Sequence, residues 1–141
     1  MGGSKEVREA TSADIPQLLV MGQSFFEASP WPAYVEFDVE RLSKTLSRLL
    51  ESEDAIILMT DRGMMAAVIY DLYPASCSVA QELFWWSEDG TGTDLRRAME
   101  TKAKAKGAKL CVLSAVENDQ MVTMDRAYRM WGYRLVERLY V

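Results

Sequence analysis

A glycine-containing loop in front of a predicted helix is the segment best suited to hold an anionic ligand. It reads Gly90-Thr91-Gly92 and follows an apolar run over residues 77–86. Two glycines let a ligand approach the backbone closely, and the first amides of a helix have no partner within that helix. A diphosphate would be held there by charge and hydrogen bonding. The same pattern also occurs in ordinary turns, so that alternative stays open.

One carboxylate, Glu82, interrupts the apolar run that precedes this loop. Strand alternation places Glu82, Phe84 and Trp86 on one face, in apolar surroundings that raise the pKa of a carboxyl group. Such a group could take a proton from an ammonium group near neutral pH. The alternative is a glutamate that faces water at an edge or an interface. The sequence has no histidine, so a general base must be a carboxylate, a tyrosine or a chain of water molecules.

Composition excludes several other kinds of site. Without histidine there is no Ser-His-Asp or Cys-His triad and no histidine-containing zinc motif. The two cysteines, Cys77 and Cys111, are too few for a zinc ribbon or a disulfide scaffold, and we expect no metal. The 21 acidic and 16 basic residues give a net charge of −5, which argues against a nucleic-acid partner. This charge is compatible with a cationic substrate, or it serves solubility alone.

The 141 residues are expected to form a single domain over 1–141. No apolar run is long enough to span a membrane, and we expect no membrane partner. The start of the chain lacks the apolar stretch of a signal peptide, so we expect a cytoplasmic protein with free thiols. Residues 1–4 are interpreted as a flexible leader or a cloning remnant.

Hydrophobic periodicity predicts a chain in which strands and helices alternate. The first helix follows a capping box over residues 11–14, the second follows Asp38, and the third runs from the glycine loop to about residue 106. A fourth carries Met124, Ala127, Tyr128 and Trp131 on one face. Strands are predicted over residues 7–9, 55–60, 64–73, 77–86, 109–116 and 133–141. The order β-α-α-β-β-β-α-β-α-β predicts an α+β domain with a mixed central sheet and about four flanking helices.

This order and two motifs resemble the GNAT superfamily of acyl-CoA-dependent N-acyltransferases, over almost the whole chain. Residues 90–95 are similar to the Gly-x-Gly/Ala-x-x-Leu core of the family's cofactor motif. Residues 128–133 are similar to its Tyr-x-x-x-Gly-Phe segment, with Tyr133 in place of Phe, and residues 81–86 resemble some phage-encoded members. The family motif begins with Gln or Arg where this chain has Ser87, and the loop before the glycines is short by a few residues.

The resemblance implies the GNAT fold. It also implies that the protein uses acetyl-CoA as a co-substrate and needs no metal. The pantetheine arm of acetyl-CoA would pair with the backbone around Trp85, Trp86 and Ser87. Asn118 matches a polar position that touches the pantetheine side. The diphosphate would lie on the amides of the motif, which are those of Gly90, Thr91, Gly92, Thr93, Asp94 and Leu95.

The resemblance also implies the reaction: direct attack of a primary amine on the thioester, in a ternary complex. Tyr128 would protonate the departing thiolate, and Glu82 would accept the amine proton. Trp31, Tyr34 and Phe37 would line the pocket for a small-molecule or peptide amine; the alternative is that they serve packing or a dimer interface. Tyr128 could instead be a core residue, and the whole chain an inactive GNAT-shaped binding or regulatory module. The apolar final strand makes a homodimer plausible.

Overall fold

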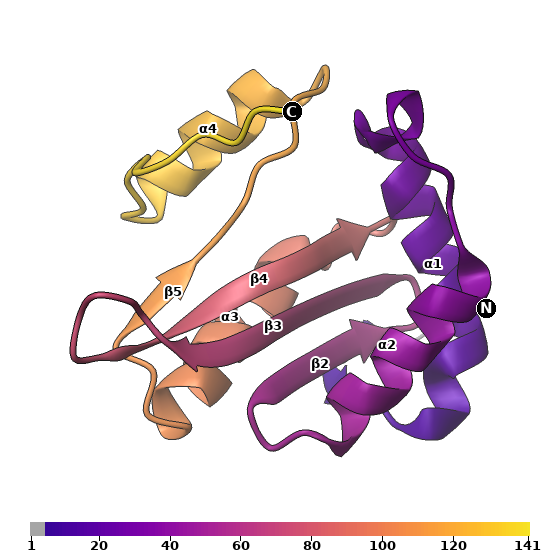
Figure 1. The fold of residues 1–141 in the computed structure, drawn as a ribbon, viewed down its shortest axis with the longest axis horizontal. Helices are drawn as coiled ribbons and strands as arrows, with labels where there is room; N and C mark the ends of the chain where they lie inside the picture. Colours follow the sequence, from indigo (N-terminus) through magenta and orange to yellow (C-terminus); the bar gives the residue numbers. More distant parts are fainter. Residues whose placement is uncertain (1–4) are drawn as a thin grey trace.

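A mixed sheet of five strands, in the order β1-β2-β3-β4-β5, forms the centre of the molecule (Figure 1). The computed structural model describes residues 5–141, so the interpretation of residues 1–4 lies outside the described residues. β2 (Ala55–Thr60), β3 (Gly63–Asp71) and β4 (Ser78–Ser87) form an antiparallel meander. β1 (Arg8–Glu9) pairs antiparallel with β2, and β5 (Leu110–Val112) pairs parallel with β4. The predicted mixed sheet is therefore confirmed.

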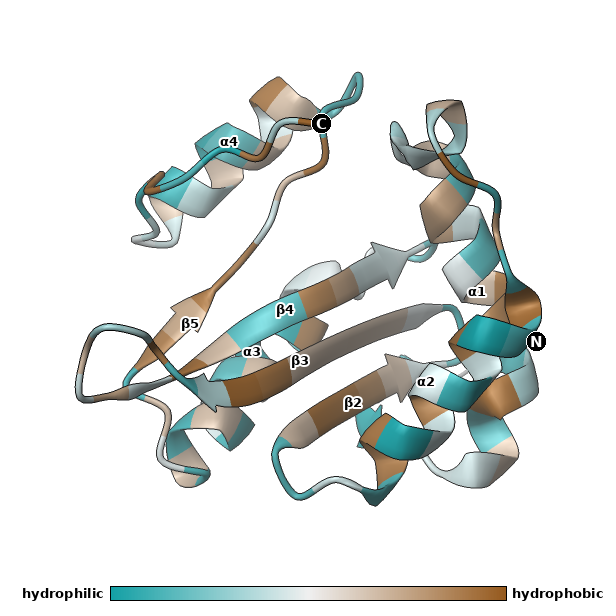
Figure 2. Cartoon of the chain, viewed as in Figure 1, coloured by the Kyte–Doolittle hydropathy of each residue, from teal (hydrophilic) through white to brown (hydrophobic). Residues whose placement is uncertain are grey.

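The helices cover both faces of this sheet. α1 (Ile15–Ala28) and α2 (Val39–Glu51) lie on one face, and α3 (Gly92–Ala105) lies on the other. Short 3-10 turns, Ser12–Asp14 and Trp31–Ala33, precede and follow α1. Alternation along β2 divides the core, because Ile56 and Leu58 pack toward α3 whereas Ile57 and Met59 pack toward α1 and α2. The apolar strands between these helices are plain in the hydropathy colours of Figure 2.

Local signals in the sequence set where the helices begin. The N–H of Thr11 donates to the Asp14 carboxylate at 2.7 Å, which completes the predicted capping box. The Asp38 carboxylate accepts the N–H of Arg41 at 3.0 Å at the start of α2. Gly107 follows α3 with φ +92°, a conformation that favours glycine, so the chain turns there, next to the predicted helix end at about residue 106.

β4 contains a β-bulge at Leu83. Ala67 of β3 pairs with Glu82 and Ala66 pairs with Phe84, so Leu83 is an extra residue. The prediction that Glu82, Phe84 and Trp86 share a face is therefore wrong. Glu82 lies opposite Ala67 on the α3 face, whereas Phe84 and Trp86 pack with the α1/α2 cluster. Trp85 packs on the α3 side, so the bulge places Glu82 and Trp85 on the same face.

β5 is shorter than the predicted strand over residues 109–116. Its pairing with β4 ends at Gln81 and Val112, and the chain then leaves the sheet and runs to α4 (Met121–Met130), as Figure 1 shows. Leu110 is 52% exposed because β5 is an edge strand with one neighbour. The departure of β5 leaves one edge of β4 open beyond Gln81.

The predicted final strand over residues 133–141 is wrong. This described segment forms no strand, and Figure 1 shows it running back along α4, away from the sheet. A strand needs a neighbouring backbone to satisfy its N–H and C=O groups, and apolar alternation does not supply one. Its apolar side chains consequently remain exposed, namely those of Leu135, Val136, Leu139, Tyr140 and Val141.

Candidate active site

Glu82 lies at the point where β4 and β5 separate. Its side chain is buried, and Oε1 accepts the backbone N–H of Ser114 at 3.1 Å. Burial raises the pKa of Glu82 to about 7, while the Ser114 hydrogen bond opposes that rise. The predicted increase in pKa is therefore confirmed, although the bulge gives this carboxyl a different face from the one predicted. A carboxyl group with this pKa can exchange a proton near neutral pH.

Tyr128 reaches the same place from α4. Its hydroxyl donates to the carbonyl oxygen of Ser114 at 2.7 Å. Burial raises the pKa of Tyr128, and the nearby Glu82 carboxyl raises it further, so the phenol keeps its proton at neutral pH. Glu82 and Tyr128 therefore form hydrogen bonds with the backbone N–H and C=O, respectively, of the same residue, Ser114. The sequence analysis missed Ser114, and no side-chain signal could have identified it, because it acts through its backbone.

Trp85 links Tyr128 to the glycine loop. Its ring stacks with that of Tyr128, with centroids 6.0 Å apart and planes 12° from parallel. Its Nε1–H donates to the carbonyl oxygen of Gly92 at 3.2 Å. A ligand at the start of α3 would therefore lie one side chain away from Tyr128.

The open edge of β4 suits the amide-containing arm of acetyl-CoA. Residues 84–87 pair with β3 on one side, and no β5 partner faces them on the other within the described chain. Backbone N–H and C=O groups on such an edge can form a ladder with an extended amide ligand. The edge leads from Glu82 toward the loop that opens α3. Trp86 and Ser87, predicted to contact the arm, both lie along it.

The glycine loop fits a diphosphate only in part. Gly90 has φ +80°, which favours glycine. The N–H of Thr91 already donates to Ser87 Oγ at 3.0 Å and to Asp89 Oδ1 at 3.2 Å, and the N–H of Leu95 donates to the Thr91 carbonyl. Hydrogen bonds from Thr91 also lower the pKa of Asp89, so a carboxylate lies in the loop. The amides left for an anion are those that open the helix, at Gly92, Thr93 and Asp94.

Comparisons with known proteins give the fold. No protein-family model matches the sequence, and no curated protein matches it. Solved structures match over 96% of the chain, among them a transcriptional regulator from Bacillus halodurans C-125, with TM-score 0.77, 16% identity and 97% of that chain covered. The aminoglycoside antibiotic 6'-N-acetyltransferase AAC(6')-Ih from Acinetobacter baumannii matches with TM-score 0.74, 14% identity and 95% coverage. The chain has the GNAT fold. An aminoglycoside acetyltransferase from an uncultured soil metagenomic sample, solved with sisomicin, shares this fold with TM-score 0.67, 16% identity and 94% coverage.

Asn118 does not lie free beside the open edge of this GNAT fold. Its Nδ2–H donates to the carbonyl oxygen of Ala28 at 3.1 Å, and its Oδ1 accepts the N–H of Gln120 at 2.9 Å. These bonds tie the loop before α4 to the end of α1, so Asn118 is already engaged away from the predicted pantetheine contact. The segment that follows α1 carries the predicted acceptor residues. Trp31 and Tyr34 are exposed there, whereas Phe37 packs on Phe26 with ring centroids 5.6 Å apart.

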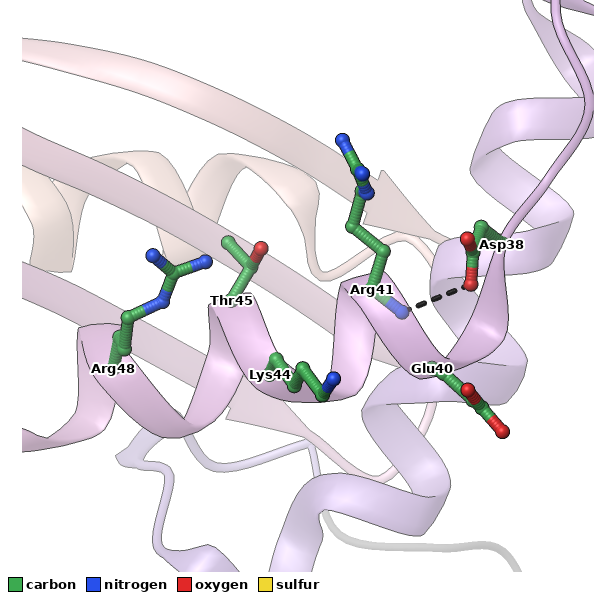
Figure 3. A pocket seen from close by; sticks show the side chains of 6 residues that line it. All are labelled: Asp38, Glu40, Arg41, Lys44, Thr45 and Arg48. Atoms are coloured by element: carbon green, nitrogen blue, oxygen red, sulfur yellow. Dashed lines mark hydrogen bonds between the residues drawn. The ribbon is translucent and has the colours of Figure 1, made fainter.

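A shallow depression on the outer side of α2 lies apart from these residues (Figure 3). Arg41, Lys44 and Arg48 line it at helical spacing, and all three are exposed. We interpret it as the solvated face of an amphipathic helix within the GNAT fold. In the described part of the chain, no group of three or more Cys, Asp or Glu side chains could hold a metal ion. No described helix is long and apolar enough to cross a membrane.

Proposed function

We propose that the chain is an N-acetyltransferase that moves an acetyl group from acetyl-CoA to a primary amine by direct attack in a ternary complex. The observation that carries this proposal is the convergence of Glu82 and Tyr128 on Ser114. One group has a pKa of about 7, and the other keeps its proton at neutral pH. Amine acylation needs one group of each kind, because the ammonium must lose a proton and the leaving thiolate must gain one.

Acetyl-CoA would be held by the open edge of β4 over residues 83–87 and by the amides that open α3, at Gly92, Thr93 and Asp94. When bound, it supplies the acetyl thioester. Glu82 takes a proton from the ammonium nitrogen, directly or through water. Tyr128 donates its hydroxyl proton to the leaving sulfur. The stacked ring of Trp85 keeps Tyr128 at the edge along which the arm would lie.

A small cationic amine is the acceptor that these features support best. The net charge of −5 favours the approach of a cation. Exposed aromatic rings, such as those of Trp31 and Tyr34, attract cations through their faces. Among the proteins that share the fold, one was solved with the aminoglycoside sisomicin, which supports this class of acceptor.

Calorimetric titration with acetyl-CoA tests the proposal, with desulfo-CoA and ATP as controls. We expect binding of acetyl-CoA in the micromolar range, at about −8 kcal/mol, and loss of that binding in Gly92→Asp. A methyl group at Gly92 would meet its neighbours at ordinary contact distances, so Gly92→Ala is the control, and it should retain binding if the charge of the aspartate causes the loss. A panel of amines, with release of the CoA thiol as the signal, would then identify the acceptor. Tyr128→Phe is the low-activity reference.

A regulatory or binding module without catalysis is the second candidate. Two observations favour it: the carboxylate of Asp89 lies in the loop expected to bind a diphosphate, and Ser87 stands where the family motif has Gln or Arg. One of the structures with this fold is described as a transcriptional regulator. Absence of heat and of thermal stabilisation up to millimolar acetyl-CoA would contradict the enzyme proposal and leave this second candidate.

A further inference from the structure

α4 is attached to the rest of the molecule by a few long side chains. None of its residues is buried, and its ribbon stands apart from the sheet in Figure 1. The contacts are made by Tyr128, Trp131 and Tyr133. The centroid of the Tyr128 ring lies 6.0 Å from that of Trp131 and 6.2 Å from that of Tyr133. Gly132, with φ +92°, ends the helix and brings Tyr133 back, so that its N–H donates to the Tyr128 carbonyl at 2.9 Å.

An ion pair on α3, formed by the buried Arg96 and the partly exposed Glu100, contacts the residues on both sides of Gly132. Arg96 is 6% exposed, and its Nη1 lies 2.9 Å from both carboxylate oxygens of Glu100. The guanidinium carbon lies 4.1 Å from the centre of the Trp131 ring. Glu100 Oε2 also accepts the hydroxyl of Tyr133 at 2.6 Å. The pair therefore contacts Trp131 through its cation and Tyr133 through its carboxylate.

General stability does not account for this pair. Arg96 lies in the first turns of α3, where the helix dipole disfavours a cation. Its Nε–H is buried and has no hydrogen-bond partner within the described residues. An apolar side chain avoids both costs, and buried ion pairs are often replaceable by apolar residues without loss of stability. The pair instead fixes the orientation of its neighbours, because a planar guanidinium and a hydrogen-bonded carboxylate restrict the angles at which the Trp131 and Tyr133 rings can lie.

We propose that Arg96 and Glu100 are positioning residues, which hold α4 through Trp131 and Tyr133 so that the Tyr128 hydroxyl reaches Ser114. The role of Tyr128 in transfer rests on the proposed function; the positioning of its ring does not. The rings of Trp131 and Tyr133 both contact the Tyr128 ring, so a shift of either displaces Tyr128 relative to Glu82. Burial and Glu100 both raise the pKa of Tyr133, which keeps the donated proton in place.

Fluorine NMR of protein labelled with 3-fluorotyrosine tests this positioning directly. The resonance missing from Tyr128→Phe identifies Tyr128, which lies against the Trp85 ring and senses its ring current. The main variant is Arg96→Met/Glu100→Gln, which leaves no unpaired buried charge and keeps an acceptor for Tyr133. We expect the Tyr128 resonance to move toward its position in the unfolded protein. Lys104→Met, which removes an exposed cation of the same helix, should leave that resonance unchanged.

Kinetics provide the second measurement. The double variant should lower kcat about 10- to 100-fold, as a small misplacement of a catalytic group does, while KM for acetyl-CoA stays the same. Arg96→Lys, which retains the charge, should have a higher kcat than the double variant and a lower kcat than the wild type. If the double variant does not fold, Tyr133→Phe removes the hydroxyl and keeps the ring, and it should move the Tyr128 resonance by a smaller amount.

An unchanged Tyr128 resonance in a folded double variant, or in Tyr133→Phe where only that variant folds, would overturn the positioning role. This readout needs no acetyl-CoA and no amine. If the variants show the expected fluorine shifts but the wild-type protein binds no acetyl-CoA, the proposed function is contradicted and the positioning role stands. The two failures are therefore distinguishable.

Discussion

The chain up to Ala103 and the chain after it are built differently. All the buried side chains of residues 5–141 lie at or before Ala103, in the strands, in α1, α2 and α3 or at the residues that cap these helices. Later residues contribute a short edge strand, α4 and an exposed final segment. The first part holds itself together by burying apolar surface. The second is held by a few aromatic rings and polar contacts, and the candidate site lies where the two parts meet. Stability and activity should therefore respond to substitutions in different parts of the chain.

The largest effect is expected at the junction, in Glu82→Gln. The amide cannot accept a proton, so kcat/KM for the amine should fall about 10²- to 10⁴-fold. In the wild type, kcat/KM should rise with pH through a midpoint of about 7, as Glu82 loses its proton. The variant should lack this rise. Glu137→Gln, an exposed carboxylate of the final segment, is the matched control, and an equal loss in both variants would contradict a special role for Glu82.

The same leucine substitution should separate the two parts by stability. Leu58 is fully buried against α3, whereas Leu139 is 84% exposed. Leu58→Ala should lower the free energy of unfolding by about 2–5 kcal/mol, because it removes buried apolar atoms and leaves a cavity. Leu139→Ala should change it by less than about 0.5 kcal/mol. Urea unfolding followed by circular dichroism measures both. Similar losses would mean that the final segment is packed in solution.

The carboxyl of Glu82 should also make stability depend on pH. Its ordinary pKa is 4.5 and its folded pKa about 7, so between these values only the folded state keeps the proton. The protonated Glu82 carboxyl therefore costs the folded state nothing below about pH 4.5. As pH rises from there to about 7, the free energy of unfolding falls by about 3 kcal/mol at most. Wild-type stability relative to Glu82→Gln should fall over this range and then level off. A difference that is constant with pH would exclude a buried, titrating Glu82.

The smallest of these effects is expected on α2. Asp38→Ala removes the side chain that accepts the Arg41 N–H, and it should lower the free energy of unfolding by about 0.5–2 kcal/mol. Activity per folded molecule should not change, since α2 packs against the first part of the chain. Asp38→Asn retains an acceptor and is the control. A loss of activity without loss of stability would connect α2 to the site and weaken the division of the chain.

Local signals predicted most of the first part. The capping box at Thr11 and the cap at Asp38 depend on residues a few positions apart, and both are present. The bulge at Leu83 depends on the register against β3, and strand alternation alone cannot reveal it. The final segment has the composition of a strand, but whether it pairs depends on a free edge within reach.

The site was predictable only where chemistry resides in side chains. A lone glutamate in an apolar strand indicated Glu82, and the resemblance to a known family indicated Tyr128. Ser114 contributes backbone atoms, so its residue type carries no signal. Asn118 bonds to Ala28, 90 positions away, and Arg96 stacks on Trp131. Such partners are brought together by the fold, so no local spacing encodes them.

The extra residue at Leu83 also prevents slippage. A regular antiparallel pair can slide by two residues and keep every side chain on its face. A pair with one bulge cannot, because the unpaired residue would have to move along the strand at each step. The position of Glu82 along β4 is consequently fixed relative to β3. A deletion of residue 83 would leave a regular pair in which Glu82, Trp85 and Trp86 keep their faces, but β4 could then slide by two residues against β3.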